Sequence, residues 1–210
     1  MQLRPGRLMS EILLVRHAEY AGTRHILLGR DDGVGLSEAG QAQAAALERR
    51  LRGEQIVSIE SSPRLRCIET AAPLAEALDL PLLIEPALEE IDFGAWTGQS
   101  FESLTTDPGW SSWNKRRGWA RPPGGETMAE AQRRIVQHMQ RAARRDPEGS
   151  IVMITHAELI RAAVLHCRRL SFEAWSQIDI APCEIVRLTF DAGETTEPSR
   201  QPAGLGPATT

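Results

Sequence analysis

Cysteine and long apolar runs are scarce in this sequence, and their scarcity excludes several classes of protein. The three cysteines, Cys67, Cys167 and Cys183, are scattered and odd in number, which argues against a disulfide framework and favours a reducing compartment. No apolar run approaches the roughly 20 residues of a membrane-spanning helix. Residues 1–10 lack the apolar centre of a secretory signal. We therefore expect a cytoplasmic protein without membrane association, in which residues 1–10 form an N-terminal extension.

An excess of positive charge is also missing. The net charge of −4 over 210 residues argues against general nucleic-acid binding. The pattern G-x-x-x-x-G-K-[ST] is absent, which argues against nucleotide-driven phosphotransfer. The H-E-x-x-H pattern and any short spacing of two histidines are absent too, which disfavours a metal-dependent hydrolase. The 41% hydrophobic and 25% charged residues are typical of one globular domain.

What the sequence does contain is an alternation of apolar strands and amphipathic helices. Strands are expected at 11–15, 55–60, 81–86, 150–155 and 183–190. Helices are expected at 36–53, 61–81, 127–145 and 157–170. Continuously apolar strands that alternate with helices are typical of a mainly parallel sheet covered on both faces, so the predicted fold class is α/β. Residues 191–210 have no core-forming pattern, and we expect a disordered tail.

Capping residues predict where the helices begin. Ser37 is the expected N-cap of the first helix and Ser62 that of the second, which Pro73 should kink or divide. Thr127 and Glu130 fit a capping box at the start of the third helix.

Two histidines follow apolar strands directly. Arg16 and His17 end the first strand, and Thr155 and His156 end the strand at 150–155. Ligands of such sheets bind at the carboxyl ends of the strands, so the two imidazoles can face each other across a pocket if the strands are neighbours. The alternative is that each histidine is structural, an interpretation that we keep for the remaining three, His25, His138 and His166. Arginine is suited to bidentate phosphate recognition, which favours an anion site beside Arg16.

Several segments, in the same order, resemble those of the histidine phosphatase superfamily, the phosphoglycerate-mutase-like proteins. The segment LLVRHAE resembles the R-H-G-E signature, and GRDDGVGLSEAGQAQA resembles the stretch that leads into the first helix. The segment SSPRLRCIETA is similar to S-x-x-x-R-x-x-x-T-A, and LEEIDFGAWTG is similar to L-x-E-x-x-F-G-x-W-x-G. The segment PPGGETMAEAQRR is similar to the G-G-E-S helix start, and THAELIRA is similar to S-H-G-G-x-I-R-A. The resemblance covers about residues 12–190.

The resemblance implies a three-layer α/β/α sandwich with a small cap region, and a phosphate pocket. The domain would span 11–190, with a cap insertion at about 100–126. The pocket residues implied are Arg16, Arg66, His17 and a protonated His156. His17 would attack phosphorus, and Glu90 would protonate the leaving oxygen and later activate water. No metal or cofactor enters this scheme.

Further substrate contacts and departures from the family pattern lie next to these residues. Thr23 stands where many members carry asparagine, the Ala157 N–H can contact phosphate, and Arg30 can reach the mouth of the site. Ala18 replaces a glycine, and Ala157-Glu158 replaces two glycines. Glu158 would repel an anion if it points inward; otherwise it faces outward or selects a substrate with a positive or donor group.

The function expected from the resemblance is hydrolysis of a small phosphorylated metabolite through a phosphohistidine. A phosphoglycerate-type phosphomutase and a catalytically weak phosphate-binding regulatory protein are the alternatives, and a homodimer is left open. Two readings also remain for the cap tryptophans, Trp110, Trp113 and Trp119. They either pack the cap onto the sheet or form a substrate-facing wall beside basic side chains.

Overall fold

The computed structural model describes residues 9–22, 25–191 and 199–201. Thr23 and most of the predicted N-terminal extension and C-terminal tail therefore lie outside the described residues. Residues 199–201 depart from the expected disorder, because they form a short strand that pairs with the edge of the sheet. In the described part of the chain, no helix has the length and apolar character needed to cross a membrane.

The strands of the described residues form one mixed, mainly parallel sheet. They are β1 (Met9–Arg16), β2 (Ile56–Ser61), β3 (Leu82–Ile84), β4 (Gly149–Thr155), β5 (Ile185–Asp191) and β6 (Ser199–Gln201), in the spatial order β3-β2-β4-β1-β5-β6. The pairs β3-β2, β2-β4 and β4-β1 are parallel, whereas β5 pairs antiparallel with both β1 and β6. The predicted α/β fold class and its mainly parallel sheet are confirmed.

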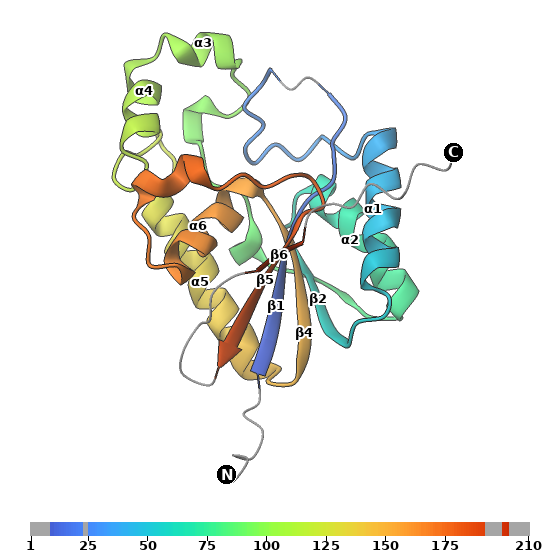
Figure 1. Cartoon of the computed structure of the whole chain (residues 1–210). Coiled ribbons are helices and arrows are strands. Elements are labelled where there is room, and N and C mark those ends of the chain that lie inside the picture. The colour runs from blue at the N-terminus through green and yellow to red at the C-terminus, as the bar shows by residue number, and fades with distance from the viewer. Residues whose placement is uncertain (1–8, 23–24, 192–198, 202–210) are drawn as a thin grey trace, which may run out of the picture.

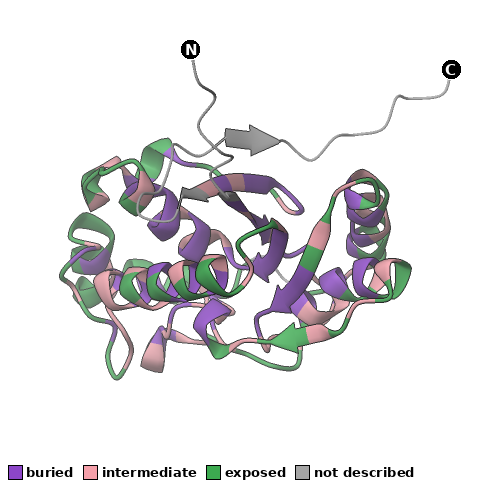
Figure 2. Cartoon of the chain, turned by 90° about the horizontal axis from the view of Figure 1, so that it is seen from below, coloured by how far each residue is buried: buried purple, intermediate pink, exposed green. Residues whose placement is uncertain are grey.

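Helices cover both faces of this sheet, as Figure 1 shows. One layer holds α1 (Glu38–Leu51) and α2 (Leu65–Leu78), and the other holds α5 (Met128–Arg145) and α6 (Ala157–Cys167). Strand β1 lies between them, with Ile12 and Leu14 in the core beside α5 and α6, and with Leu13 and Val15 in the core beside α1 and α2. The buried strands at the centre of Figure 2 thus separate two apolar cores, which is the expected three-layer sandwich.

Shorter elements lie beyond the carboxyl end of β1 (Figure 1). The predicted cap contains α3 (Phe101–Thr105) and α4 (Pro108–Lys115). Three 3-10 helices complete the described chain: η1 (Pro86–Leu88), η2 (Gly94–Trp96) and η3 (Phe172–Gln177).

The helix ends agree with the sequence at two of the three predicted caps. Ser37 accepts a hydrogen bond from the backbone N–H of Gly40, and Thr127 and Glu130 form the predicted capping box. The prediction for α2 was wrong: its N-cap is Arg64, and Ser62 lies outside the helix because its hydroxyl bonds to His156 instead. Helix α2 also continues through Pro73 instead of dividing there.

Candidate active site

The two histidines that follow apolar strands lie side by side. Strands β1 and β4 are parallel neighbours in a register that pairs Arg16 with Thr155. The backbone N–H of His17 donates to the carbonyl of Thr155 at 2.9 Å. The rings of His17 and His156 meet edge to face, with centroids 5.3 Å apart. The sheet topology therefore produces the facing imidazoles that the sequence predicted.

A cavity of about 250 Å³, here called the histidine cavity, opens beside these rings. Five of the residues expected at the site line it: Arg16, His17, Arg66, Glu90 and Ala157. His156 is fully buried behind the lining and contacts Arg66, whose Nη2 donates to His156 Nδ1 at 3.2 Å. The side chains expected to carry the chemistry thus gather in one place.

His17 is held as a neutral ring with one free nitrogen. Its Nδ1 lies 2.8 Å from the Ala18 carbonyl, and since a carbonyl only accepts, Nδ1 carries the proton. Burial, supported by the positive charge of Arg66, lowers the pKa of His17 to about 3. At neutral pH the Nε2 atom therefore has an unprotonated lone pair, which is what a nucleophile requires.

Thr70 fixes the loop that carries this histidine. Its hydroxyl accepts from the Ala18 N–H at 2.9 Å and donates to the Arg66 carbonyl at 2.6 Å. The loop after β1 is thereby tied to the first turns of α2, so that His17 and Arg66 are positioned together. Sequence reasoning did not single out Thr70, although the segment SSPRLRCIETA contains it.

His156 differs from the expected protonated ring. Burial, strengthened by the nearby Arg66 guanidinium, lowers the pKa of His156 well below its ordinary value. Arg66 donates to Nδ1, so the neutral ring carries its proton on Nε2 and donates it to the Ser62 hydroxyl at 2.8 Å. The expectation of a protonated His156 is corrected. A fully buried ring beside the Arg66 guanidinium stays neutral at neutral pH, because protonation would place two positive charges next to each other.

The two arginines supply the positive charge of the cavity. Arg16 donates from Nη1 to the Ile180 carbonyl at 2.7 Å, and Arg66 donates from Nη2 to the Gly29 carbonyl at 2.8 Å. The Nε–H of each is buried and has no hydrogen-bond partner among the described residues. Two anchored guanidiniums with unused donors are suited to an oxyanion with several acceptor atoms.

Burial shifts the Glu90 carboxyl group toward its protonated form. Burial, followed by the negative charge of Glu158, raises the pKa of Glu90 to about 7. One of its oxygens accepts from the Ile91 N–H at 3.0 Å, and the other lies 3.7 Å from His156 Nδ1. Of the acidic residues at 89, 90 and 92, only Glu90 lines the histidine cavity. Near neutral pH it can therefore both donate and accept a proton.

Arg30 contacts the segment of Glu90 and lies outside the lining of the histidine cavity. Its Nε donates to the Glu90 carbonyl at 2.8 Å, and its Nη2 forms an ion pair with Glu126 at 2.7 Å. It is also absent from the lining of the histidine cavity. These bonds tie the guanidinium to the backbone of Glu90, so Arg30 helps to position this segment, and its contact with substrate stays a prediction.

Glu158 lines the cavity, but its charge is compensated. One oxygen pairs with Arg117 at 3.0 Å and the other with Arg161 at 2.8 Å. The Arg117 guanidinium in turn lies over the Trp113 ring, 4.3 Å from its centroid. The repulsion of an anion that the sequence raised as a concern is therefore offset by two neighbouring cations.

Two glycines let the segment after Glu90 pack against the start of α5. Gly94 has a φ of +52°, and a Cβ built on Gly125 would lie 2.2 Å from the Asp92 carbonyl oxygen. The Glu126 N–H donates to that same carbonyl at 2.9 Å. Only glycine allows so close a backbone approach, which explains why the segments LEEIDFGAWTG and PPGGETMAEAQRR both carry glycines here.

Both interpretations of the cap tryptophans apply to Trp110 and Trp113, and neither applies to Trp119. Trp113 is buried and stacks on Trp110 with centroids 5.3 Å apart, so these rings pack the cap. The same two rings line the histidine cavity together with Phe101, which also makes them a wall of the site. Trp119 does neither, because 89% of it is exposed and it lies outside this lining.

Metal ligands do not gather in the described part of the chain. Among residues 9–22, 25–191 and 199–201, no three His, Cys, Asp or Glu side chains are arranged to hold a metal ion. Metal independence itself stays a prediction for experiment.

Comparison with known proteins assigns the family. A model of the histidine phosphatase superfamily, branch 1, matches residues 12–199. The chain belongs to this superfamily. Phosphoserine phosphatase 1 of Hydrogenobacter thermophilus is 31% identical over 175 residues, which cover 79% of this chain and 78% of that protein. The probable phosphoglycerate mutase GpmB of Yersinia pestis is 27% identical over 188 residues, or 87% and 86% of the two chains.

Solved structures of the superfamily share the fold. The phosphoserine phosphatase of Entamoeba histolytica, a mutant in complex with phosphoserine, superposes with a TM-score of 0.81 at 21% identity over 92% of this chain and 98% of that one. The relatives of this chain thus include a phosphatase of a small phosphorylated metabolite and a probable mutase. The family resemblance read from the sequence is confirmed.

Proposed function

We propose that this histidine phosphatase hydrolyses phosphomonoesters of small metabolites without a metal ion, through a phosphohistidine on His17. The observation that carries the proposal is the convergence of a neutral His17, two anchored guanidiniums and a protonated Glu90 around one cavity. Nucleophile, charge neutralisation and acid are the three parts that phosphoryl transfer by covalent catalysis needs.

The first step transfers the phosphoryl group to the enzyme. His17 Nε2 attacks phosphorus, the bond from phosphorus to the ester oxygen breaks, and Glu90 gives its proton to the leaving oxygen. Arg16 and Arg66 neutralise the negative charge on the transferred oxygens throughout. His17 Nδ1, hydrogen-bonded to the Ala18 carbonyl, keeps its proton, and the positive charge of the phosphorylated ring is balanced by the phosphoryl oxygens.

The second step returns the enzyme to its starting state. The ionised Glu90 accepts a proton from water, the oxygen of that water attacks phosphorus, and the bond from phosphorus to His17 Nε2 breaks. Inorganic phosphate leaves, and Glu90 is protonated again. A carboxyl group with a pKa of about 7 serves both steps, since neither of its forms is strongly disfavoured at neutral pH.

The decisive experiment removes the nucleophile. Hydrolysis of p-nitrophenyl phosphate by His17→Ala should fall by a factor on the order of 10⁴ or more, whereas His166→Ala, an exposed histidine at the end of α6, should behave as wild type. Wild-type activity should also survive EDTA. Undiminished hydrolysis by His17→Ala would remove the assignment, and loss with EDTA would favour a metal-dependent hydrolase.

The same assay separates a phosphatase from a mutase. Given 3-phosphoglycerate, a phosphatase releases inorganic phosphate, whereas a mutase forms the 2-phospho isomer and releases little. We expect phosphate release to dominate for those metabolites that the enzyme accepts.

A further inference from the structure

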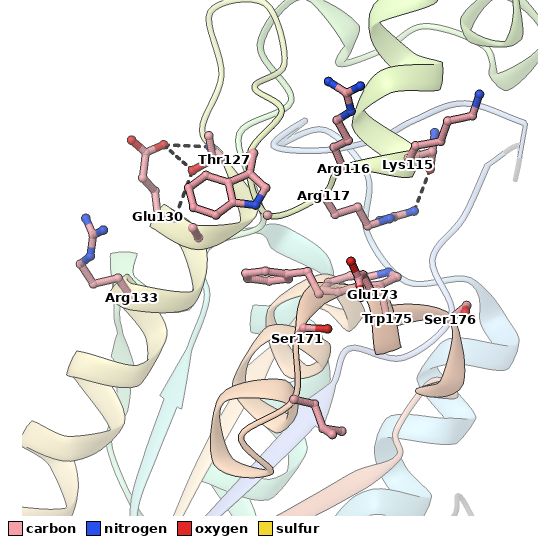
Figure 3. A pocket seen from close by; sticks show the side chains of 16 residues that line it. Lys115, Arg116, Arg117, Thr127, Glu130, Arg133, Ser171, Glu173, Trp175 and Ser176 are labelled. Atoms are coloured by element: carbon pink, nitrogen blue, oxygen red, sulfur yellow. Dashed lines mark hydrogen bonds between the residues drawn. The ribbon is translucent and has the colours of Figure 1, made fainter.

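A second, larger cavity lies beside the cap on the far side of Arg117. Its volume is about 980 Å³, against about 250 Å³ for the histidine cavity. Three segments enclose it: the end of α4 with residues 116–119, the first turns of α5, and residues 170–176 around η3 (Figure 3). A volume of this size suits a metabolite, since ligand pockets usually enclose roughly 300 to 1,000 Å³.

Within the part of the chain that the structure describes, Arg117 alone lines both cavities. Its guanidinium lies between two indoles, 4.3 Å from the Trp113 centroid and 5.0 Å from the Trp175 centroid. Figure 3 shows this side chain running above Trp175, and Asn114 and Glu158 accept its hydrogen bonds. The stack of indole, guanidinium and indole thus forms a partition, and the second cavity is a separate compartment.

Aromatic side chains provide flat apolar walls inside the second cavity. Phe172, Trp119 and Trp175 all line it. Trp119 is 89% exposed, so its ring offers an open apolar face at the rim of the cavity. Trp175 is only 6% exposed, yet its indole N–H has no hydrogen-bond partner among the described residues. That N–H is itself buried, so what Trp175 and its neighbours Phe172 and Trp119 offer a ligand is apolar ring surface.

The charge around the second cavity is positive. Four basic and two acidic side chains line it. Among the described residues, Lys115, Arg116 and Arg133 form no ion pair, whereas the acidic Glu130 is already paired with Arg121 at 2.6 Å. Figure 3 shows Arg133 and Glu130 on one side of the cavity, and Lys115 and Arg116 above it. Unpaired cations on two sides favour an anion over a neutral or cationic ligand.

We propose that this second cavity is a binding site, separate from the histidine cavity, for a planar aromatic ligand that carries a negative charge. The ring would stack on Trp119 and Phe172, as aromatic pairs do. The anionic group would lie toward the basic rim near Arg133. A phosphomonoester would not be consumed there, because the histidines and Glu90 lie beyond the partition.

The test is a calorimetric titration of the wild-type protein with 1-naphthalenesulfonate, which is aromatic, anionic and not a phosphoester. We expect saturable binding of one molecule per chain. Trp119→Ala should weaken the affinity about fivefold, because one stacking contact is lost. Arg133→Glu should weaken it about threefold at low salt and less at high salt, because the rim charge is screened.

Two matched variants separate this site from other binding. Phe101→Ala removes a ring from the histidine cavity, and Arg141→Glu makes the same charge change two turns further along α5; both should leave the affinity unchanged. The neutral 2-naphthol should bind at least tenfold more weakly. The proposal is overturned by absent binding, by unchanged affinity in Trp119→Ala or Arg133→Glu, by weakening in Phe101→Ala, or by equal affinity for 2-naphthol.

Discussion

The side chains of His17 and Glu90 lie in the same desolvated cavity, and burial moves both toward their neutral forms. Burial lowers the pKa of His17 to about 3, because it disfavours the imidazolium cation, and raises the pKa of Glu90 to about 7, because it disfavours the carboxylate anion. The result at neutral pH is a free nucleophilic nitrogen beside a carboxyl group of which a substantial fraction still holds a proton. Burial thus favours both proposed roles, that of His17 as the nucleophile and that of Glu90 as the acid.

Leaving-group dependence tests the role of Glu90. Glu90→Gln cannot donate a proton, so hydrolysis of alkyl phosphates, whose leaving groups are poor, should fall by a factor on the order of 10² to 10⁴. Hydrolysis of p-nitrophenyl phosphate should fall far less when the phosphorylation step is measured in single turnovers, because p-nitrophenolate leaves without a proton. Equal losses with both substrates would remove Glu90 from the role of acid.

The pH profile tests the charge of Glu158. The acid form of Glu90 is present below its pKa of about 7, so kcat/KM for an alkyl phosphate should fall as the pH rises through about 7. Glu158→Gln removes a negative charge that raises the pKa of Glu90, and the alkaline limb should therefore move to lower pH.

Glu173→Gln is the matched control, since Glu173 lines the second cavity and not the histidine cavity. Its profile should follow that of the wild type. An alkaline limb that stays in place in Glu158→Gln would show that Glu158 does not influence the acid.

At this scale the sequence predicted residue identities better than protonation states. Arg16, His17 and His156 follow from the positions of strand ends, and Arg66 and Glu90 follow from the resemblance. The protonation of His156 was predicted wrongly, because complete burial beside Arg66 is a property of the packed fold. The roles of Ser62 and Thr70 depend on hydrogen bonds to residues 94 and 52 positions away in the chain, which no local pattern reveals.

Among the elements, the contact between the segment after Glu90 and the start of α5 is the most sensitive to substitution. Gly125→Ala would place a methyl group against the Asp92 carbonyl oxygen, so the backbone must move. We expect a loss of about 1–3 kcal/mol in the free energy of unfolding, measured in urea, together with reduced kcat on alkyl phosphates because Glu90 is displaced.

Gly53→Ala serves as the control for this variant. A Cβ at Gly53 meets nothing within 4 Å, so the added methyl should leave both the stability and the activity close to wild type. If Gly125→Ala were as stable and as active as Gly53→Ala, the close packing of these two segments would not position the acid.

Element boundaries were predictable where local chemistry determines them. The caps at Ser37 and Thr127 were read correctly because each is a short-range hydrogen bond between a side chain and the backbone. Ser62 was misassigned because a tertiary partner, His156, bonds to its hydroxyl. Pro73 does not end α2, whose buried face, including Cys67, Ala71 and Leu74, packs into the core beside α1.

For the molecule as a whole, the apolar strands predicted the layers but not the full order of the sheet. A mainly parallel sheet followed from strands that alternate with helices, whereas the antiparallel placement of β5 next to β1 could not be read from its sequence. The partition at Arg117 was not predictable either, because it joins Trp113 of the cap to Trp175 of η3, residues that only the folded chain brings together. The candidate active site thus depends on the order of the strands, whereas the proposed second site depends on the contact between the cap and η3.

A covalent phosphoenzyme is the central claim, and trapping it is the most direct test. The enzyme would be mixed with an aryl phosphate and quenched in alkali within one turnover, and the phosphoryl group would then be located by mass spectrometry of peptides. We predict the label on His17 alone and its complete loss in His17→Ala. A label on another residue, or turnover by an enzyme that never carries phosphate, would contradict the account.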